Sequence, residues 1–91
     1  MKISELLLKP ERWTQKYYAR DRQGLPVPAT SENAICWCLH GAIRRCYPNT
    51  ENMVYSKVAA KTTEQYNCGP IAFNDNATYE EVISLVKEMD I

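Results

Sequence analysis

Three of the four cysteines and the only histidine of this chain fall within fifteen residues, AICWCLHGAIRRCYP at 34–48. Cysteine and histidine are the side chains that bind transition metals and that build thiol-based catalytic centres. The flanking residues favour a helix, because a serine and a glutamate stand where a helix would begin and paired arginines stand where it would end. We therefore expect a helix over residues 32–46, and the chemistry depends on how that helix arranges the ligands.

On such a helix Cys36 and Cys38 would lie about 160° apart, so they could not share one metal ion. Cys36 and His40 are four residues apart and would share a face, and Cys68 could add a third ligand for zinc or another transition metal. Structural zinc motifs contain a second close pair of ligands, which this sequence lacks. The alternative is that Cys36 and Cys38 are small buried hydrophobic residues. We expect no metal site and no cofactor.

Thiol catalysis needs a thiolate beside a base, together with a site for the developing oxyanion. Cys36 and His40 could meet on the helix, but no glycine-rich turn or helix start activates the thiol, and nothing places Cys68 near His40. The sequence therefore favours a non-catalytic protein and leaves an enzyme or a metal- or ligand-binding module as the alternative.

A second polar group consists of Thr14, Gln15, Asn74 and Asp75. Asn74 and Asp75 follow a short apolar run and precede a helix start, a position where such side chains cap backbone N–H groups. Two interpretations stay open. The four residues make only local turn contacts, or they form a small polar pocket between a hairpin and the last helix.

Basic and aromatic residues alternate between positions 9 and 22. This pattern could bind single-stranded nucleic acid by neutralising phosphates and stacking bases, but acidic residues dilute it and no known nucleic-acid-binding motif is present. We therefore consider these residues first as a protein-contact surface. Trp37 would project from the central helix, either under the hairpin or toward a partner. The candidates for partner binding are Trp13, Lys16, Tyr17, Arg20, Arg22, Trp37 and Arg44.

The elements that must position these residues are short. A first helix should end near Lys9, since the residue before a proline is pushed out of the helical region. The turn Asp21–Gly24 predicts a β-hairpin with arms over 16–20 and 25–27, the second arm lying at an edge because of its prolines. Gly41, inside the expected helix 32–46, indicates close approach of another element, such as an aromatic side chain.

The second half of the chain predicts further helices. One is expected over 51–61, a short buried strand over 71–73, and a final helix that begins at the capping box Thr78–Glu81. The whole chain, 1–91, is thus expected to form a single small α+β domain that is mainly helical. It should contain three to four helices, a short β-hairpin and one short extra strand.

Composition excludes several classes of protein. The net charge is zero, but residues 1–48 carry eight Lys or Arg against four Asp or Glu, a net of +4, and residues 49–91 carry three against seven, a net of −4. No apolar run approaches the roughly 20 residues that span a bilayer, and the N-terminus does not have the pattern of a signal peptide. We expect a cytoplasmic protein with free thiols and no membrane partner.

Six segments taken together resemble a known family: WTQ at 13–15, YARD at 18–21, Gly24, CWCLHGA at 36–42, IAFND at 71–75 and TYEEV at 78–82. The chain is similar in these segments to a family of small bacterial and phage-associated proteins that is described only as a domain of unknown function. The resemblance implies a single α+β domain and no defined activity. We expect non-catalytic binding of a protein partner, such as a phage or mobile-element protein that inhibits or modulates a host factor.

Overall fold

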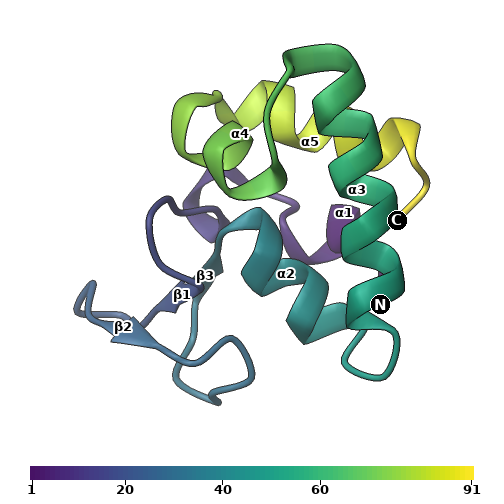
Figure 1. Ribbon diagram of the computed structural model, residues 1–91. Helices are drawn as coiled ribbons and strands as arrows, with labels where there is room; N and C mark the ends of the chain where they lie inside the picture. Colours follow the sequence, from purple (N-terminus) through teal and green to yellow (C-terminus); the bar gives the residue numbers. More distant parts are fainter.

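The computed structural model describes all residues 1–91 and shows an α+β fold that is mainly helical, with a small sheet at one end (Figure 1). The expected fold class is confirmed. The elements in chain order are α1 (Ile3–Leu6), the 3-10 turn η1 (Pro10–Arg12), β1 (Ala19–Arg20), β2 (Pro26–Val27), β3 (Cys36–Trp37), α2 (Leu39–Cys46), α3 (Glu51–Tyr66), α4 (Pro70–Asn76) and α5 (Tyr79–Glu88).

The predicted hairpin is present, and β1 lies in the middle of a three-stranded antiparallel sheet of order β2-β1-β3. Ala19 pairs with Val27 on one side and with Trp37 on the other. The turn closes as its sequence predicts, with the Gly24 N–H donating to the Asp21 carbonyl at 2.9 Å. The structure adds a parallel bridge between Trp13 and Trp37, so the segment that precedes β1 covers the outer edge of β3.

The prediction of a helix over residues 32–46 is wrong for the first half of that range. Cys36 and Trp37 form β3, and the helix begins only at Leu39. Residues 31–34 form a turn instead, in which the Ala34 N–H donates to the Ser31 carbonyl. Pairing with β1, sixteen residues earlier in the chain, takes the backbone groups that a helix would have used, so tertiary structure overrides local propensity here.

Two predictions in the second half also need correction. The helix expected over 51–61 continues to Tyr66 and ends at Asn67, which has the left-handed conformation typical of a helix end. The strand expected over 71–73 does not exist, because these residues lie inside α4. The third strand of the sheet is instead β3, in a segment for which a helix was predicted. Pro70 at the first position of α4 suits a helix start, since its missing N–H has no helical partner to lose.

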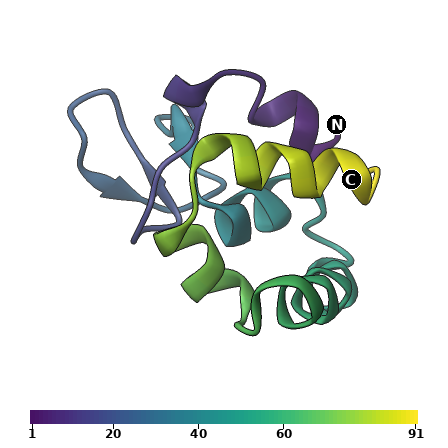
Figure 2. The same cartoon turned by 90° about the horizontal axis from the view of Figure 1, so that it is seen from above.

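The final helix begins as predicted, with the Thr78 hydroxyl accepting from the Glu81 N–H and the Glu81 carboxylate accepting from the Thr78 N–H. Its buried residues join a continuous cluster of sixteen buried hydrophobic side chains. Helix α2 is central to the packing and contacts α1, α3 and α4. The two termini meet beside α1 (Figure 2), where Lys2 pairs with Asp90 and the Ile3 N–H donates to the Ile91 carbonyl. None of the helices has the length and apolar character needed to span a membrane.

Candidate functional site

The site forms where the segment before β1 crosses the start of α2. Gly41 allows this crossing, because a Cβ at position 41 would lie 2.7 Å from the carbonyl carbon of Tyr18. The Tyr18 carbonyl in turn accepts a hydrogen bond from the Cys38 N–H at 3.2 Å. Close approach at Gly41 is therefore confirmed, but the neighbour is backbone rather than the aromatic side chain that we expected. Tyr18 is thereby fixed against the first turn of α2.

Cys38 has a structural role at this crossing. Its Sγ caps α2 by accepting from the Gly41 N–H at 3.3 Å, and its side chain is buried. Burial raises the pKa of the Cys38 thiol, and hydrogen bonds from backbone N–H groups at the helix start, chiefly that of Gly41, only partly oppose that effect. At neutral pH the group is therefore a thiol and not a thiolate, so it lacks the nucleophile that thiol catalysis requires.

Asn74 ties three segments together at the other side of the site. Its side chain is almost fully buried, and its Oδ1 accepts from the Trp13 indole N–H at 2.7 Å and from the Leu39 N–H at 3.0 Å. Its Nδ2 donates to the Thr14 carbonyl at 3.1 Å. One amide thus connects α4, the first turn of α2 and the segment before β1, and all of its bonds stay within the chain.

The predicted polar set does come together around Asn74. Gln15 donates from Nε2 to the carbonyls of Asn74 and Ala77, and Asp75 accepts the Lys16 N–H at 2.8 Å. Lys16 has a φ of +76°, which a lysine adopts only when its surroundings hold it there. The set is therefore more than turn chemistry, but its amide groups serve to hold residues 13–16 against α4 rather than to point at a ligand.

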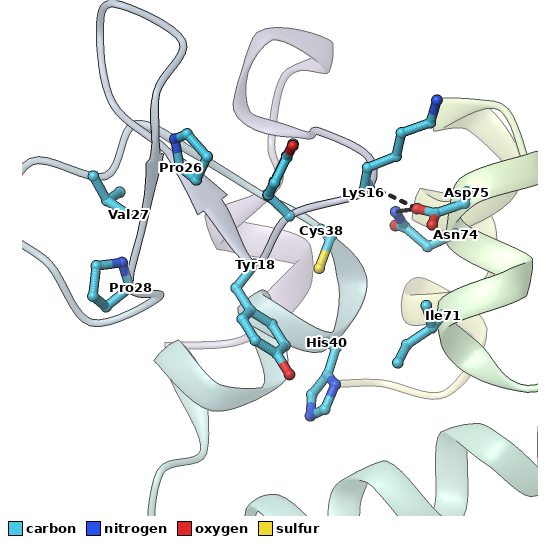
Figure 3. Close-up of a pocket in the computed structure, with 11 residues that line it drawn as sticks. Lys16, Tyr18, Pro26, Val27, Pro28, Cys38, His40, Ile71, Asn74 and Asp75 are labelled. Atoms are coloured by element: carbon cyan, nitrogen blue, oxygen red, sulfur yellow. Dashed lines mark hydrogen bonds between the residues drawn. The ribbon is translucent and has the colours of Figure 1, made fainter.

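Beside this network lies the largest hollow on the surface, with a volume of about 490 Å³. Figure 3 shows Pro26, Val27 and Pro28 on one side, Ile71, Asn74 and Asp75 on the other, and Tyr18, Cys38 and His40 between them. Lys16 and Tyr17 complete the lining. We call this hollow the hairpin–α4 cavity. Most of its wall is apolar, and the polar groups gather on the α4 side.

His40 stands at the floor of the cavity and links α2 to α3. Its Nε2 lies 3.2 Å from Oε2 of Glu51, and its ring packs between Tyr18 and Tyr55. The other ring nitrogen, Nδ1, is buried without a hydrogen-bond partner. Arg44 donates to both oxygens of Glu51, and this bond, with a smaller contribution from His40, holds the pKa of Glu51 below its usual value.

The three candidate metal ligands do not form a cluster. Cys36 lies in β3 with its Sγ 3.9 Å from the Arg20 carbonyl, so the helical face that it was expected to share with His40 does not exist. Cys68 lines a separate hollow of about 210 Å³ with Tyr66 and Phe73. No three His, Cys, Asp or Glu side chains lie close enough together to hold a metal ion, and all four cysteines are free.

The expected partner-binding residues divide into two groups. Trp37 is buried in the core with its indole N–H donating to the Ala29 carbonyl, so of its two alternatives the exposed, partner-facing one is wrong. Trp13 is half-buried, and Arg44 is engaged by Glu51. The others lie at or near the surface around the hairpin: Lys16, Tyr17, Arg20 and Arg22.

Sequence analysis did not single out Tyr18, Val27, Ile71 or the hairpin prolines as site residues. The sequence carried a helix-start signal at Pro70, but nothing in it indicated that Ile71 would be exposed at a cavity. Nothing local indicated that Val27 would face α4, since that depends on the crossing at Gly41.

The comparisons with known proteins agree with the resemblance found in the sequence. Residues 2–89 match the model of a family of unknown function (DUF6197), and the chain belongs to this family. No curated protein and no solved structure matches the chain.

Proposed function

We propose that this member of a family of unknown function is a non-catalytic binding domain, and that the hairpin–α4 cavity receives an apolar segment of a protein partner. The observation that carries the proposal is the cavity itself, about 490 Å³ of hollow lined mostly by apolar side chains. Ligand sites in proteins are typically apolar hollows of about 300–1,000 Å³ with a few polar groups that fix orientation.

The exposure of the lining supports a partner. Tyr17 is 46% exposed, Tyr18 41% and Ile71 52%, and all three border the same cavity although Ile71 is distant in sequence from the two adjacent tyrosines. Scattered exposed apolar residues need no explanation, but several around one hollow are typical of an interaction site. A partner that covered them would remove this apolar surface from water.

Two alternatives have less support from the geometry. The Cys38 sulfur is a neutral helix cap and the Nε2 of His40 is taken by Glu51, so neither atom is placed for nucleophilic or base chemistry. For nucleic acid, the aromatic rings that would stack on bases are already occupied in part. Tyr17 carries the Arg20 guanidinium at 4.5 Å, and Trp37 is buried.

The kind of partner is the finer part of the proposal. We propose a host factor that the domain inhibits or modulates, as for a phage or mobile-element protein. What supports this is the small size of the chain, the separation of its charge into a basic first half and an acidic second half, and the sequence resemblance to phage-associated proteins.

Site-specific photo-crosslinking tests the proposal. Benzoylphenylalanine at position 71 is expected to give a discrete covalent adduct in cells that naturally carry the protein. The same residue at position 53 is the matched control, since Met53 is 55% exposed and lies on α3, outside the cavity lining. An adduct at 71 that disappears in the Tyr18→Ala background would support the cavity as the site. Equal labelling at both positions, or none at position 71, would contradict it.

A further inference from the structure

We infer that the occupant of the hairpin–α4 cavity is an extended segment of a partner protein in which apolar and acidic side chains alternate. The inference rests on the proposed function and adds the chemistry that the cavity recognises. Successive side chains of an extended segment point to opposite sides, so the apolar residues would enter the cavity while the acidic ones face its rim. Three features of the cavity wall lead to this occupant.

The first feature is the free edge of β2, which cannot add a strand. The Asp21 N–H bonds the Leu25 carbonyl, and Ala19 is directly opposite Val27, so the alternation of an antiparallel pair turns the polar backbone groups of Val27 toward β1. The neighbouring residues on the outer edge are Pro26 and Pro28, which have no N–H to donate. A partner segment is therefore held through its side chains and not by β-sheet extension.

The second feature is that the cavity tyrosines already carry cations. The Arg20 guanidinium lies 4.5 Å from the centre of the Tyr17 ring, and the Arg44 guanidinium lies 4.5 Å from the centre of the Tyr18 ring. A cation over an aromatic face is attracted by the ring, and a second cation nearby would be repelled by the first. The tyrosines thus do not form a cage for an ammonium or guanidinium group of a partner.

The third feature is the excess of positive charge along the hairpin. Residues 16–28 hold three Lys or Arg against one Asp, a net of +2. Lys16 and Arg22 form no ion pair, and Arg20 donates only to uncharged oxygens, those of Thr14, Gly24 and Gln15.

The carboxylate that lines the cavity, Asp75, does not cancel this excess. It accepts hydrogen bonds from the Lys16 N–H and from Nδ2 of Asn74, so its charge is partly compensated within the chain. Opposite charge across an interface favours the approach and the orientation of a partner. The rim therefore favours acidic side chains.

The test uses three acetylated and amidated eight-residue peptides, which alternate Glu with Leu, Lys with Leu, and Glu with Ser. Each is titrated into the ¹⁵N-labelled full chain and followed by amide chemical shifts. We expect the Glu–Leu peptide to shift the resonances of residues 16–18, 27 and 71, and to bind more weakly as salt is raised. We expect the other two peptides to bind at least about tenfold more weakly, because each lacks one half of the recognised pattern.

Variants distinguish the contribution of cavity residues to peptide affinity from the contribution of the overall charge of the protein. Lys16→Glu should weaken the Glu–Leu peptide, while Lys57→Glu, the same charge change at an exposed site on α3, should leave its affinity within about twofold. Ile71→Ser should weaken it about tenfold, and Met53→Ser should not.

The outcomes distinguish the inference from the function on which it rests. If the Lys–Leu peptide shifts the same resonances as strongly as the Glu–Leu peptide, the cavity binds apolar segments but the inferred acidic preference is wrong. If the Glu–Leu peptide binds and the shifts map to a different surface, the inference is overturned. If no Leu-containing peptide shifts the cavity resonances, both the inference and the proposed function fail.

Discussion

Gly41→Ala should destabilise this protein strongly, although alanine is the better helix former by about 1 kcal/mol. The added Cβ would overlap the carbonyl oxygen of Tyr18, and would lie 2.7 Å from the carbonyl carbon and 3.1 Å from the Cα of the same residue. Non-bonded carbons prefer separations of about 3.5–4.0 Å, so the Tyr18 backbone would have to move away from α2 by at least about 1 Å. All three neighbours are backbone atoms, which cannot move aside as a flexible side chain would.

Two costs follow from that displacement. Overpacking of this kind costs about 1–3 kcal/mol. The hydrogen bond from the Cys38 N–H to the Tyr18 carbonyl would lengthen beyond its present 3.2 Å, which leaves a buried donor unsatisfied at a cost of about 1–3 kcal/mol. After the gain in helix propensity is subtracted, we expect a loss of about 3 kcal/mol, which corresponds to a fall in Tm of about 12–24 °C for a domain of this size.

Urea and thermal unfolding of three glycine variants would measure the effect. At Gly69 a Cβ meets nothing within 4 Å and φ is negative, but Gly69 is the N-cap of α4, a position where alanine is less favourable than glycine. This loss opposes the gain from a less flexible unfolded chain, so Gly69→Ala should change the unfolding free energy by less than about 1 kcal/mol. At Gly24 there is also open space but φ is +83°, so Gly24→Ala should cost about 1 kcal/mol through backbone strain alone. If the unfolding free energy of Gly41→Ala is within about 0.5 kcal/mol of that of Gly69→Ala, the close approach of the Tyr18 backbone to α2 is refuted.

Three further predictions concern the network around the cavity. Asn74→Ala should cost about 3 kcal/mol in unfolding free energy, because the buried Leu39 N–H and the half-buried indole N–H of Trp13 lose their acceptor. A change below about 1 kcal/mol would contradict the role of Asn74 in joining these segments. Arg44 holds the pKa of Glu51 in the folded state below its value in the unfolded state. The pair therefore stabilises the fold fully at pH values above the unfolded-state pKa, and this stabilisation is lost as the pH falls through the folded-state pKa. Glu51→Gln should therefore be less stable than the wild type at pH 7, with the difference shrinking toward pH 3; a difference that is constant with pH would refute this. Lys16→Gly should be tolerated, and Lys16→Val should lower the unfolding free energy by more than about 1 kcal/mol, since a β-branched residue fits a positive φ poorly. Equal Tm values for the two variants would show that the backbone strain at position 16 is absent.

The parts of the fold that sequence predicted correctly are those with local causes. The hairpin follows from Asp21 and Gly24 at the two ends of one turn, and α5 follows from a capping box whose two hydrogen bonds join residues three apart. These contacts join residues that are close in the sequence, so they could be predicted without knowledge of the remaining chain.

The cysteine stretch was mispredicted because its structure depends on a distant partner. Local propensity favours a helix from residue 32, but pairing with β1 makes Cys36 and Trp37 a strand. The true helix start was also hidden, since Cys38 is not among the usual capping residues although its sulfur acts as one. At α4 the sequence did contain a signal for a helix start, Gly69 followed by Pro70. The short apolar run at 71–73 has the composition of a strand, and the prediction followed that composition instead.

The candidate site shows the same division between local and long-range information. Sequence left open whether Thr14, Gln15, Asn74 and Asp75 make local turn contacts or form one polar group, and in the structure hydrogen bonds join the segment 14–16 to Asn74 and Asp75. Sequence could not predict the cavity, whose opposite wall comes from β2. That wall faces α4 because Gly41 lets the Tyr18 backbone cross α2, and because Asn74 fixes the segment on the far side of the crossing. A substitution at either position should therefore disturb the cavity even though Gly41 lines none of it.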